Sequence, residues 1–247
     1  MNKLKTAALI PARYNSTRFP AKALAKISGQ AMIVRVYESV KACQLIDQVY
    51  VATDDQRIKK AVEKAGGQVI MTDAKHQSGT DRIAEAAAEI EADLIVNVQG
   101  DEPLIRAQDI APALEVFAQR PELKMSTLKR KITAAEAENP DLVKVITDQN
   151  DYALYFSRSP IPYYRAETVK NKNYYQHIGL YVYRRDFLLK YAKMQQTELE
   201  KAESLEQLRA LENGYQIKVI ETNAKLIGVD RKEDIKLVEK ELAARQN

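Results

Sequence analysis

The alternation of two kinds of segment in the first half of this sequence constrains its fold more than any other feature. Short runs rich in valine and isoleucine alternate with longer segments whose apolar residues recur at helical spacing. The apolar runs are residues 6–10, 48–53, 68–72 and 93–99, and the helical segments are residues 31–43, 55–66 and 79–92. This alternation predicts an α/β fold with right-handed crossovers and a predominantly parallel central sheet.

The pattern changes after about residue 125. The expected elements are two extended runs within residues 143–165, a strand at 177–186, one long helix at 198–213, a strand at 216–222 and an amphipathic helix at 231–246. We therefore expect a core of residues 1–125, an inserted smaller sheet region of residues 126–215, and a returning strand and helix of residues 216–247, all in a single compact unit. The proline-containing stretch 160–172 is predicted to be a mobile loop.

Charge and cysteine content exclude several classes of protein. The 247 residues carry 38 Lys and Arg against 34 Asp and Glu, a net charge of +4, and the two signs are interspersed along the chain. We expect no nucleic-acid partner, because no basic run has interleaved aromatic residues. No apolar stretch is long enough for a membrane span, so no membrane insertion is expected. The single cysteine, Cys43, permits no intrachain disulfide, and the cytoplasm is the expected location.

The loop after the first strand is cationic. Residues 11–22, PARYNSTRFPAK, contain Arg13, Arg18 and Lys22 but neither G-x-G-x-x-G nor the G-x-x-x-x-G-K-[ST] phosphate loop. Guanidinium groups bind phosphate oxygens in bidentate fashion, and a lysine supplies a compact charge. The pattern favours a triphosphate site, and a solvated loop is the alternative.

Polar residues also follow the second and third strands, where parallel sheets bind ligands. Residues 54–55 are two aspartates at a helix start, which are either helix caps or ligands. Gln77 and Ser78, before Gly79, either contact the edge of a base or cap the next helix. His76 has no Cys or His partner at metal-ligand spacing, so a zinc site is not expected.

Acidic residues supply a candidate magnesium site. Asp101 ends the fourth strand after a glycine, beside the cationic loop, and Mg²⁺ prefers one or two carboxylates together with substrate phosphates. Glu102 either assists it or is solvated. Asp230 is a candidate second ligand, although Asp230 and Glu233 also fit an acidic analogue of a capping box before the last helix.

Eight motifs together resemble those of the sugar-activating 3-deoxy-manno-octulosonate cytidylyltransferases, the CMP-Kdo synthetase family. They are PARYNSTRFPAK (11–22), ATDD (52–55), HQSGTDR (76–82), NVQGDEP (97–103), YALYFSRSPIP (152–162), HIGLYVY (177–183), LEQLR (205–209) and GVDRKED (228–234). The resemblance runs from about residue 7 to residue 240. Ala21 departs from the glycine usual in the family, and Arg231 and Lys232 depart from threonine and proline.

The resemblance implies a fold and an activity. The fold would be the Rossmann-like, glycosyltransferase-A-like nucleotidyltransferase fold with an inserted smaller sheet and dimerisation region. The activity would be transfer of CMP from CTP to the anomeric hydroxyl of 3-deoxy-D-manno-octulosonate, an eight-carbon acid sugar, with release of pyrophosphate, for lipopolysaccharide biosynthesis. It also implies a homodimer and Mg²⁺ as cofactor. The alternatives are an 8-amino form of the sugar, a nucleotide-sugar glycosyltransferase and a non-catalytic nucleotide-binding module.

The resemblance also implies roles for individual residues. The catalytic residues would be Asp101, Asp230, Lys22 and Arg13, with Asp101 and Asp230 as metal ligands. The nucleotide-binding residues would be Pro11, Ala12, Arg13, Arg18, Lys22, Gln77, Ser78, Gly79 and Asp101. The sugar-binding residues would be Gln99, Arg158, His177, Tyr181, Glu206 and Gln207. An arginine such as Arg158 is a natural partner for the carboxylate of a sugar acid.

Overall fold

The chain divides into two compact units, residues 1–111 with 225–247 and residues 112–224. The computed structural model describes residues 3–15, 19–76, 78–166, 168, 171–224 and 226–246. The division falls inside helix α4 (Ala107–Gln119), whereas the sequence placed boundaries near residues 125 and 215. The end of α4 belongs to the second unit, within which the Ser126 hydroxyl donates a hydrogen bond to the Ala113 carbonyl (2.7 Å).

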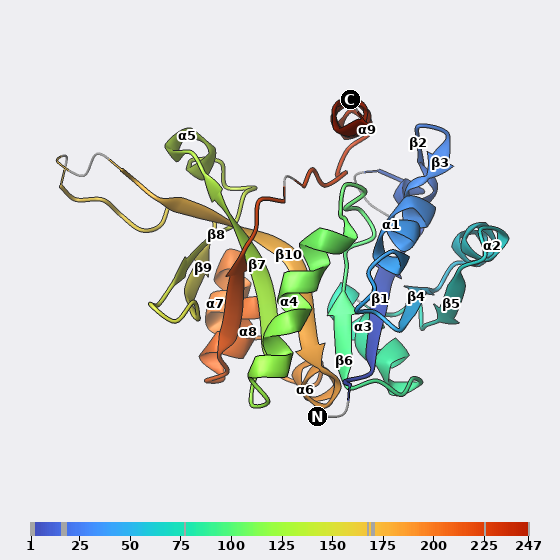
Figure 1. The fold of residues 1–247 in the computed structure, drawn as a ribbon, viewed down its shortest axis with the longest axis horizontal. Coiled ribbons are helices and arrows are strands. Elements are labelled where there is room, and N and C mark those ends of the chain that lie inside the picture. The colour runs from blue at the N-terminus through green and yellow to red at the C-terminus, as the bar shows by residue number, and fades with distance from the viewer. Residues whose placement is uncertain are drawn as a thin grey trace. The chain divides into compact units, whose positions relative to one another are not determined.

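The first unit contains the predicted parallel sheet (Figure 1). Its strands, in spatial order, are β6 (Leu94–Asn97), β1 (Thr6–Ala12), β4 (Gln48–Thr53) and β5 (Gln68–Met71), and every neighbouring pair is parallel. The helices that follow strands are α1 (Met32–Lys41), α2 (Gln56–Lys64) and α3 (Gly79–Ala88). The α/β fold with a mostly parallel sheet is thereby confirmed.

The burial of β1 explains why this order forms. Residues 7–10 of β1 are fully buried, as expected for a central strand covered on both faces. Its register places Leu9 opposite Tyr50 of β4 and opposite Asn97 of β6. The carboxyl ends of β1 and β6 consequently lie side by side.

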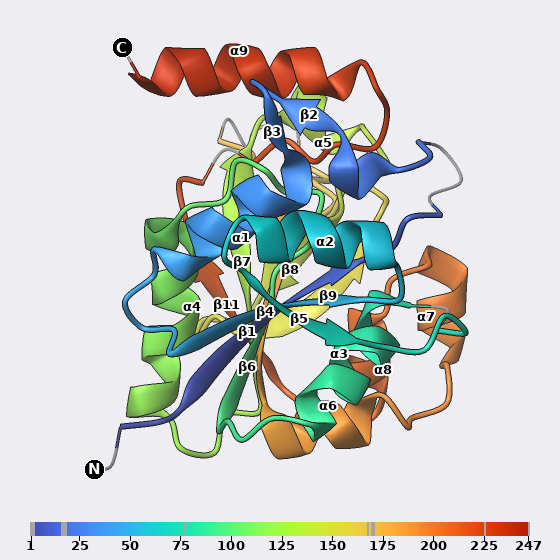
Figure 2. The same ribbon diagram turned by 90° about the vertical axis from the view of Figure 1, so that its right-hand side faces the viewer.

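A small hairpin and the last helix complete the first unit. The separate antiparallel sheet consists of β2 (Lys26–Ile27) and β3 (Gln30–Ala31), joined by Ser28 and Gly29 at positive φ. Helix α9 (Asp234–Gln246) lies beside this hairpin (Figure 2).

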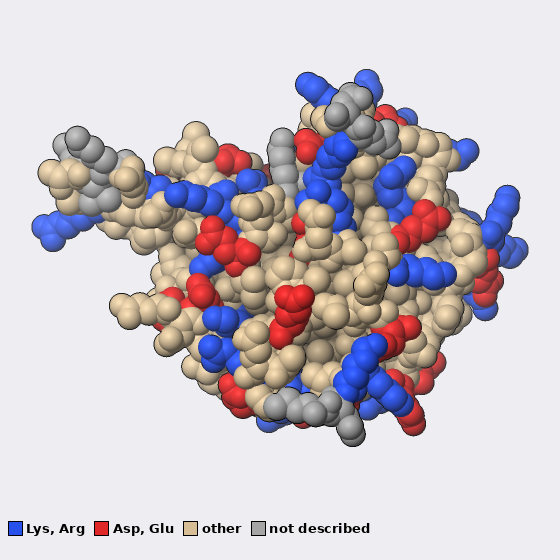
Figure 3. Space-filling view, viewed as in Figure 1, with Lys and Arg blue, Asp and Glu red and all other residues tan. Residues whose placement is uncertain are grey.

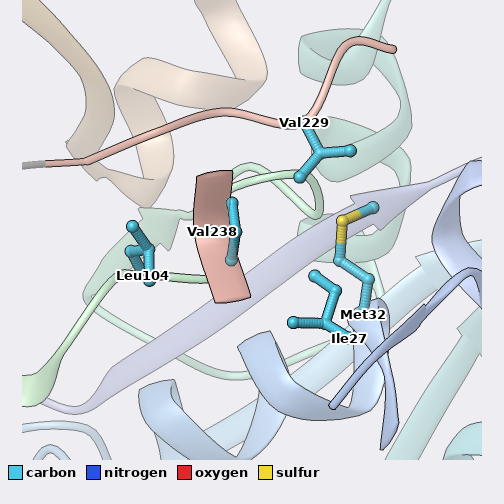
Figure 4. Packing of buried hydrophobic residues seen from close by; sticks show 5 residues of the cluster. All are labelled: Ile27, Met32, Leu104, Val229 and Val238. Carbon is cyan, nitrogen blue, oxygen red and sulfur yellow. The ribbon is translucent and has the colours of Figure 1, made fainter. Parts of the chain in front are cut away.

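A hydrophobic cluster fixes the segment that enters α9. Val238 of α9 and Val229 pack with Ile27, Met32 and Leu104, and all five side chains are at most 1% exposed (Figure 4). The Val229 N–H also donates to the Asp101 carbonyl (2.9 Å). The residue that follows Val229, Asp230, is therefore held near the loop after β6 by both packing and a backbone bond.

The second unit contributes five further strands to the nine-stranded sheet. Its strands are β7 (Met125–Ile132), β8 (Lys144–Thr147), β9 (Ala153–Ser157), β10 (Tyr174–Arg184) and β11 (Ile217–Glu221). β7 pairs antiparallel with β10 and parallel with β11, and β8 pairs antiparallel with β9 and with β10. The short helices α5 (Ala134–Ala137) and α6 (Arg185–Tyr191) flank β10. The extended runs and strands predicted in this region are present.

One helix prediction was wrong. Residues 198–213 form two helices, α7 (Glu198–Glu203) and α8 (Gln207–Glu212), instead of one. Ser204 adopts a left-handed conformation (φ 53°) and ends α7, and the Leu205 N–H returns to the Glu200 carbonyl (3.1 Å). The break is stabilised across the two helices by a buried ion pair, in which Arg209 donates to the Glu200 carboxylate at 2.8 and 2.5 Å.

Two further predictions have partial outcomes. Residues 167, 169 and 170 of the stretch 160–172 lie outside the described residues, and the mobility of that stretch stays a prediction. Among the described residues, no helix combines the length and apolar character needed to cross a membrane. The visible face carries Lys and Arg interspersed with Asp and Glu, as the sequence suggested (Figure 3).

Candidate functional site

A pocket of about 250 Å³ opens at the carboxyl ends of the parallel strands of the first unit. The residues lining it come from the end of β1, from the loops that follow β1, β5 and β6, from α1, α3 and η1 (Lys22–Leu24), and from the segment before α9. They are Pro11, Ala12, Arg13, Lys22, Ala23, Met32, His76, Ser78, Gly79, Arg82, Gln99, Gly100, Asp101 and Asp230. The structure therefore brings together most of the residues that the sequence assigned to nucleotide binding.

The loop after β1 delivers two cations to this pocket. Arg13 is exposed, and Lys22 begins the short helix η1. Arg18 lies outside the described residues. The loop closes where the Ala21 N–H donates to the Tyr14 carbonyl (3.0 Å), and Ala21 adopts a left-handed conformation (φ 58°). The position where the family commonly has glycine thus has the backbone conformation that favours glycine.

Lys22 lies between the two carboxylates predicted to bind metal. Its Nζ donates to Asp101 Oδ2 (2.6 Å) and is 3.7 Å from Asp230 Oδ1. The Lys22 side chain is only 15% exposed, so this charge is poorly screened by water. The pocket therefore carries opposite charges within a few ångströms of each other.

The donor set suits a magnesium ion that a nucleotide also coordinates. Within the described ranges, no group of three or more His, Cys, Asp or Glu side chains could hold a metal. Two carboxylates that share one cationic partner, with room for substrate phosphates, fit the preference of Mg²⁺ for few protein ligands. Asp101 and Asp230 would be those ligands.

Glu102 is a third carboxylate beside them. Its Oε2 is buried without a hydrogen-bond partner among the described residues. Burial, reinforced by the negative charges of Asp101 and Asp230, raises the pKa of Glu102 to about 8. Of the two roles predicted for Glu102, solvation is wrong for Oε2, because this oxygen is buried in the protein.

The capping pair predicted for Asp230 and Glu233 was wrong in its second residue. The backbone N–H groups of Asp230 and Arg231 donate to Asp234 Oδ2 at 2.9 and 2.7 Å. Asp234, and not Glu233, therefore supplies the acidic cap before α9. The Asp230 carboxylate itself lines the pocket, 3.7 Å from Lys22 Nζ.

The loop after β5 meets the pocket through His76 and Ser78. The Ser78 hydroxyl accepts from the Asp81 N–H (3.0 Å) and so caps α3. His76 Nε2 bonds the Glu85 carboxylate of the same helix. Gln77 lies outside the described residues. Together these contacts hold the loop against the start of α3.

Arg82 is a pocket residue that the sequence analysis quoted within a motif but did not select. Its side chain is buried, donates to Thr72 Oγ1 (2.5 Å) and lies 3.3 Å from Asp54 Oδ1. Asp55 accepts from the Arg57 N–H (2.8 Å) and is the N-cap of α2. Residues 54–55 were predicted to be either helix caps or ligands. Asp55 is a helix cap, and Asp54 forms an ion pair with Arg82, which lines the pocket.

Gly100 explains how the ends of β1 and β6 approach each other. A Cβ at Gly100 would lie 2.8 Å from the Pro11 carbonyl oxygen and 3.3 Å from Ile33 Cδ1. A side chain there would push the two loops apart. Gln99, which was assigned to the sugar, lines this same pocket, and its amide donates to Asn97 Oδ1 (3.3 Å).

The other residues assigned to the sugar belong to the second unit. Arg158 follows β9; its Nε donates to the Glu203 carbonyl (2.8 Å) and its Nη1 to the Pro140 carbonyl (3.1 Å). Gln207 is buried at the start of α8, and Glu206 precedes it, with its carbonyl accepting from the Tyr191 hydroxyl.

His177 and Tyr181 lie on β10. His177 is 8% exposed, and burial lowers its pKa to about 3, so the ring is neutral at physiological pH. Its Nε2 lies 2.9 Å from Thr127 Oγ1, and the edge of Phe156 packs against its ring. Burial raises the pKa of the Tyr181 hydroxyl. A neutral His177 can exchange hydrogen bonds but offers no charge to a ligand.

A parallel α/β sheet with cationic and acidic side chains gathered at its strand ends is the arrangement of a nucleotide-binding transferase. The sequence matches the cytidylyltransferase family over residues 7–222, and the chain belongs to that family. This confirms the resemblance that the motifs indicated.

Two curated relatives and one solved structure make the match specific. The 3-deoxy-manno-octulosonate cytidylyltransferase of Geobacter sulfurreducens is 51% identical over 245 residues, covering 95% of this chain and 98% of the relative. That of Fusobacterium nucleatum is 52% identical, covering 95% and 96%. The structure of a CMP:2-keto-3-deoxy-manno-octonic acid synthetase complexed with CTP is 43% identical, with a TM-score of 0.93, covering 98% of this chain and 99% of that one.

Ala21 should carry measurable backbone strain. A left-handed conformation is unfavourable for a residue with a Cβ, so Ala21→Gly should raise the free energy of unfolding by roughly 0.5–1 kcal/mol. Urea denaturation measures this change. Ala42→Gly is the matched control, because Ala42 is exposed and right-handed (φ −71°) and should gain nothing. An Ala21→Gly variant less stable than the parent chain would show that the left-handed backbone of Ala21 is not strained.

Buried His177 should make the protein sensitive to mild acid. The unfolded chain protonates this histidine near pH 6.5, whereas the folded protein does so only near pH 3. The neutral His177 therefore contributes fully to the free energy of unfolding above pH 6.5. This contribution is lost as pH falls, by about 1.4 kcal/mol at pH 5.5.

His177→Gln should remove that part of the pH dependence. Urea denaturation of both proteins at pH 7.5 and pH 5.5 makes the comparison, and the variant should lose less stability than the parent chain over this interval. Equal losses in the two proteins would show that His177 is not held neutral.

Proposed function

We propose that this chain transfers CMP from CTP to the anomeric hydroxyl of 3-deoxy-D-manno-octulosonate and releases pyrophosphate. The observation that carries the proposal is the arrangement of Lys22 against Asp101 and Asp230 in a pocket at the ends of parallel strands. The names of the relatives and the CTP complex of the solved structure support the nucleotide and the sugar.

The cationic residues would bind the triphosphate. Arg13 and Lys22 line the pocket, and their charges would stabilise the negative charge that builds on the leaving pyrophosphate. Ser78 and Gly79 would place the start of α3 near the nucleotide, since both line the same pocket. Positioning and charge stabilisation, not a covalent intermediate, would carry the reaction.

Asp101 and Asp230 would hold Mg²⁺. The ion, when bound, would neutralise phosphate charge and polarise an oxygen bound to it. Lys22 would then exchange its bond to Asp101 for a phosphate oxygen, because a carboxylate occupied by a metal is a poorer partner for the ammonium group. The protein would thus keep its two carboxylates paired with a cation both before and after the nucleotide binds.

The sugar acid would bind through residues of the second unit. Arg158 would pair with its carboxylate, and Glu206, Gln207, His177 and Tyr181 would exchange hydrogen bonds with its hydroxyls. We further propose that the chain acts in the cytoplasm as a homodimer, and that its product serves lipopolysaccharide assembly.

The direct test is pyrophosphate release. We expect release with CTP, Mg²⁺ and 3-deoxy-manno-octulosonate, and little with ATP, GTP or UTP. The 8-amino sugar, tested in parallel, separates the two acceptors that the sequence left open. No release with either sugar would contradict the proposed acceptor.

Asp101→Asn should lower turnover by about a hundredfold or more, because it removes a charged metal ligand but keeps the shape of the side chain. Its melting temperature should stay close to that of the parent chain. Asp141→Asn, at an exposed site before β8, is the control and should retain full activity. Near-normal turnover of Asp101→Asn at limiting Mg²⁺ would refute the metal assignment.

A further inference from the structure

Arg158 is unusually well fixed for a residue that follows a strand. Besides the two bonds of its guanidinium group, its backbone N–H donates to Glu203 Oε2 (2.8 Å) and its carbonyl accepts from Lys144 Nζ (2.5 Å). The other oxygen of the Glu203 carboxylate accepts from the Ser157 hydroxyl (2.6 Å). Contacts from three separate segments thus converge on one residue.

Lys144 is a buried group that the proposed reaction does not use. It is fully buried on β8, and its ammonium group donates to the Asn139 carbonyl (2.9 Å) as well as to that of Arg158. Burying a charged ammonium group is costly unless it is paired and hydrogen-bonded. Burial, together with the neighbouring Arg158 charge, lowers the pKa of Lys144. A lysine buried at this position fixes the Asn139 and Arg158 carbonyls that it binds.

The break between α7 and α8 supplies the other side of this arrangement. Because Ser204 ends α7, the Glu203 carbonyl is not used inside a continuous helix and accepts from Arg158 Nε. The Glu203 side chain at the same time binds the backbone of β9. A continuous helix would have directed that carbonyl along its own axis.

We propose that Lys144 and Glu203 are positioning residues that hold the Arg158 guanidinium in the orientation that receives the carboxylate of the sugar acid. This inference rests on the proposed function, which gives Arg158 that ligand. Two of the five N–H donors of the guanidinium are committed to the Glu203 and Pro140 carbonyls. Nη2 makes no hydrogen bond to any described residue, and Nη1 keeps one N–H beyond its bond to Pro140, so donors of the Nη1–Nη2 edge are available to a bidentate partner.

Three variants test the proposal, after pyrophosphate release by the parent chain has been established. Glu203→Gln places an amide donor against the Arg158 and Ser157 donors, and Lys144→Met removes the ammonium group but keeps the chain length. Each should raise KM for 3-deoxy-manno-octulosonate about tenfold while KM for CTP stays within about twofold. Arg158→Lys, which cannot form a bidentate pair, should raise the same KM at least as much.

The controls separate positioning from a loss of structure. Glu198→Gln changes an exposed carboxylate on α7 and should leave both KM values unchanged. A purely structural role would lower the melting temperature and affect both substrates alike. If either buried-site variant does not fold, Ser157→Ala, which removes the hydroxyl that donates to Glu203 and accepts from the Ser159 N–H (3.0 Å), should still raise KM for the sugar acid selectively.

The outcomes are distinguishable. No turnover by the parent chain with the sugar acid would refute the proposed function, and this inference with it. Turnover by the parent chain with an unchanged sugar KM in Arg158→Lys would leave CMP transfer standing and refute the assigned ligand of Arg158. An effect of Arg158→Lys without a selective effect of Glu203→Gln and Lys144→Met would refute the positioning roles alone.

Discussion

The bond between Lys22 and Asp101 is the interaction on which the rest of the nucleotide pocket depends. Lys22 reaches it from the loop after β1, and Asp101 reaches it from the loop after β6, because these two parallel strands are neighbours. Gly100 permits the close approach, since a Cβ there would meet the Pro11 carbonyl oxygen. Asp230 joins the pair because Val229 is packed in a hydrophobic cluster and bonded to the Asp101 carbonyl. Backbone topology and packing thus place three charges that come from distant parts of the chain.

This arrangement has a chemical consequence. Without a ligand, the single lysine offsets part of the negative charge of the two carboxylates. A nucleoside triphosphate would supply a negative partner for the lysine, and a divalent cation would supply a positive partner for the carboxylates. Both members of the ion pair could therefore exchange partners together. The buried Glu102, whose pKa is raised, limits the additional negative charge at this point.

Much of the first unit could be predicted from the sequence, because its signals are local. Runs of valine and isoleucine between helical segments identified the parallel strands, and the rule that ligands bind beyond their carboxyl ends selected residues 11–13, Lys22 and Asp101. The long helix at residues 198–213 was predicted wrongly because helical periodicity continues through Ser204, and only tertiary contacts such as the Glu200–Arg209 pair reveal the break. Arg82 was not selected because its burial beside Asp54 depends on the packing of α3 on the sheet. Likewise, nothing in the sequence indicated that Lys144 binds the carbonyl of Arg158.

The measurement that tests the central claim most directly is calorimetric binding of CTP, with and without Mg²⁺, to the parent chain and to Lys22→Met. If Lys22 exchanges Asp101 for the triphosphate, the variant should bind CTP at least about tenfold more weakly in the presence of Mg²⁺. Without Mg²⁺ the parent chain should lose affinity as well, because its two carboxylates would face the phosphates directly. Equal affinity of the two proteins for CTP and Mg²⁺ would contradict the account, since the ion pair would then have no part in binding the nucleotide.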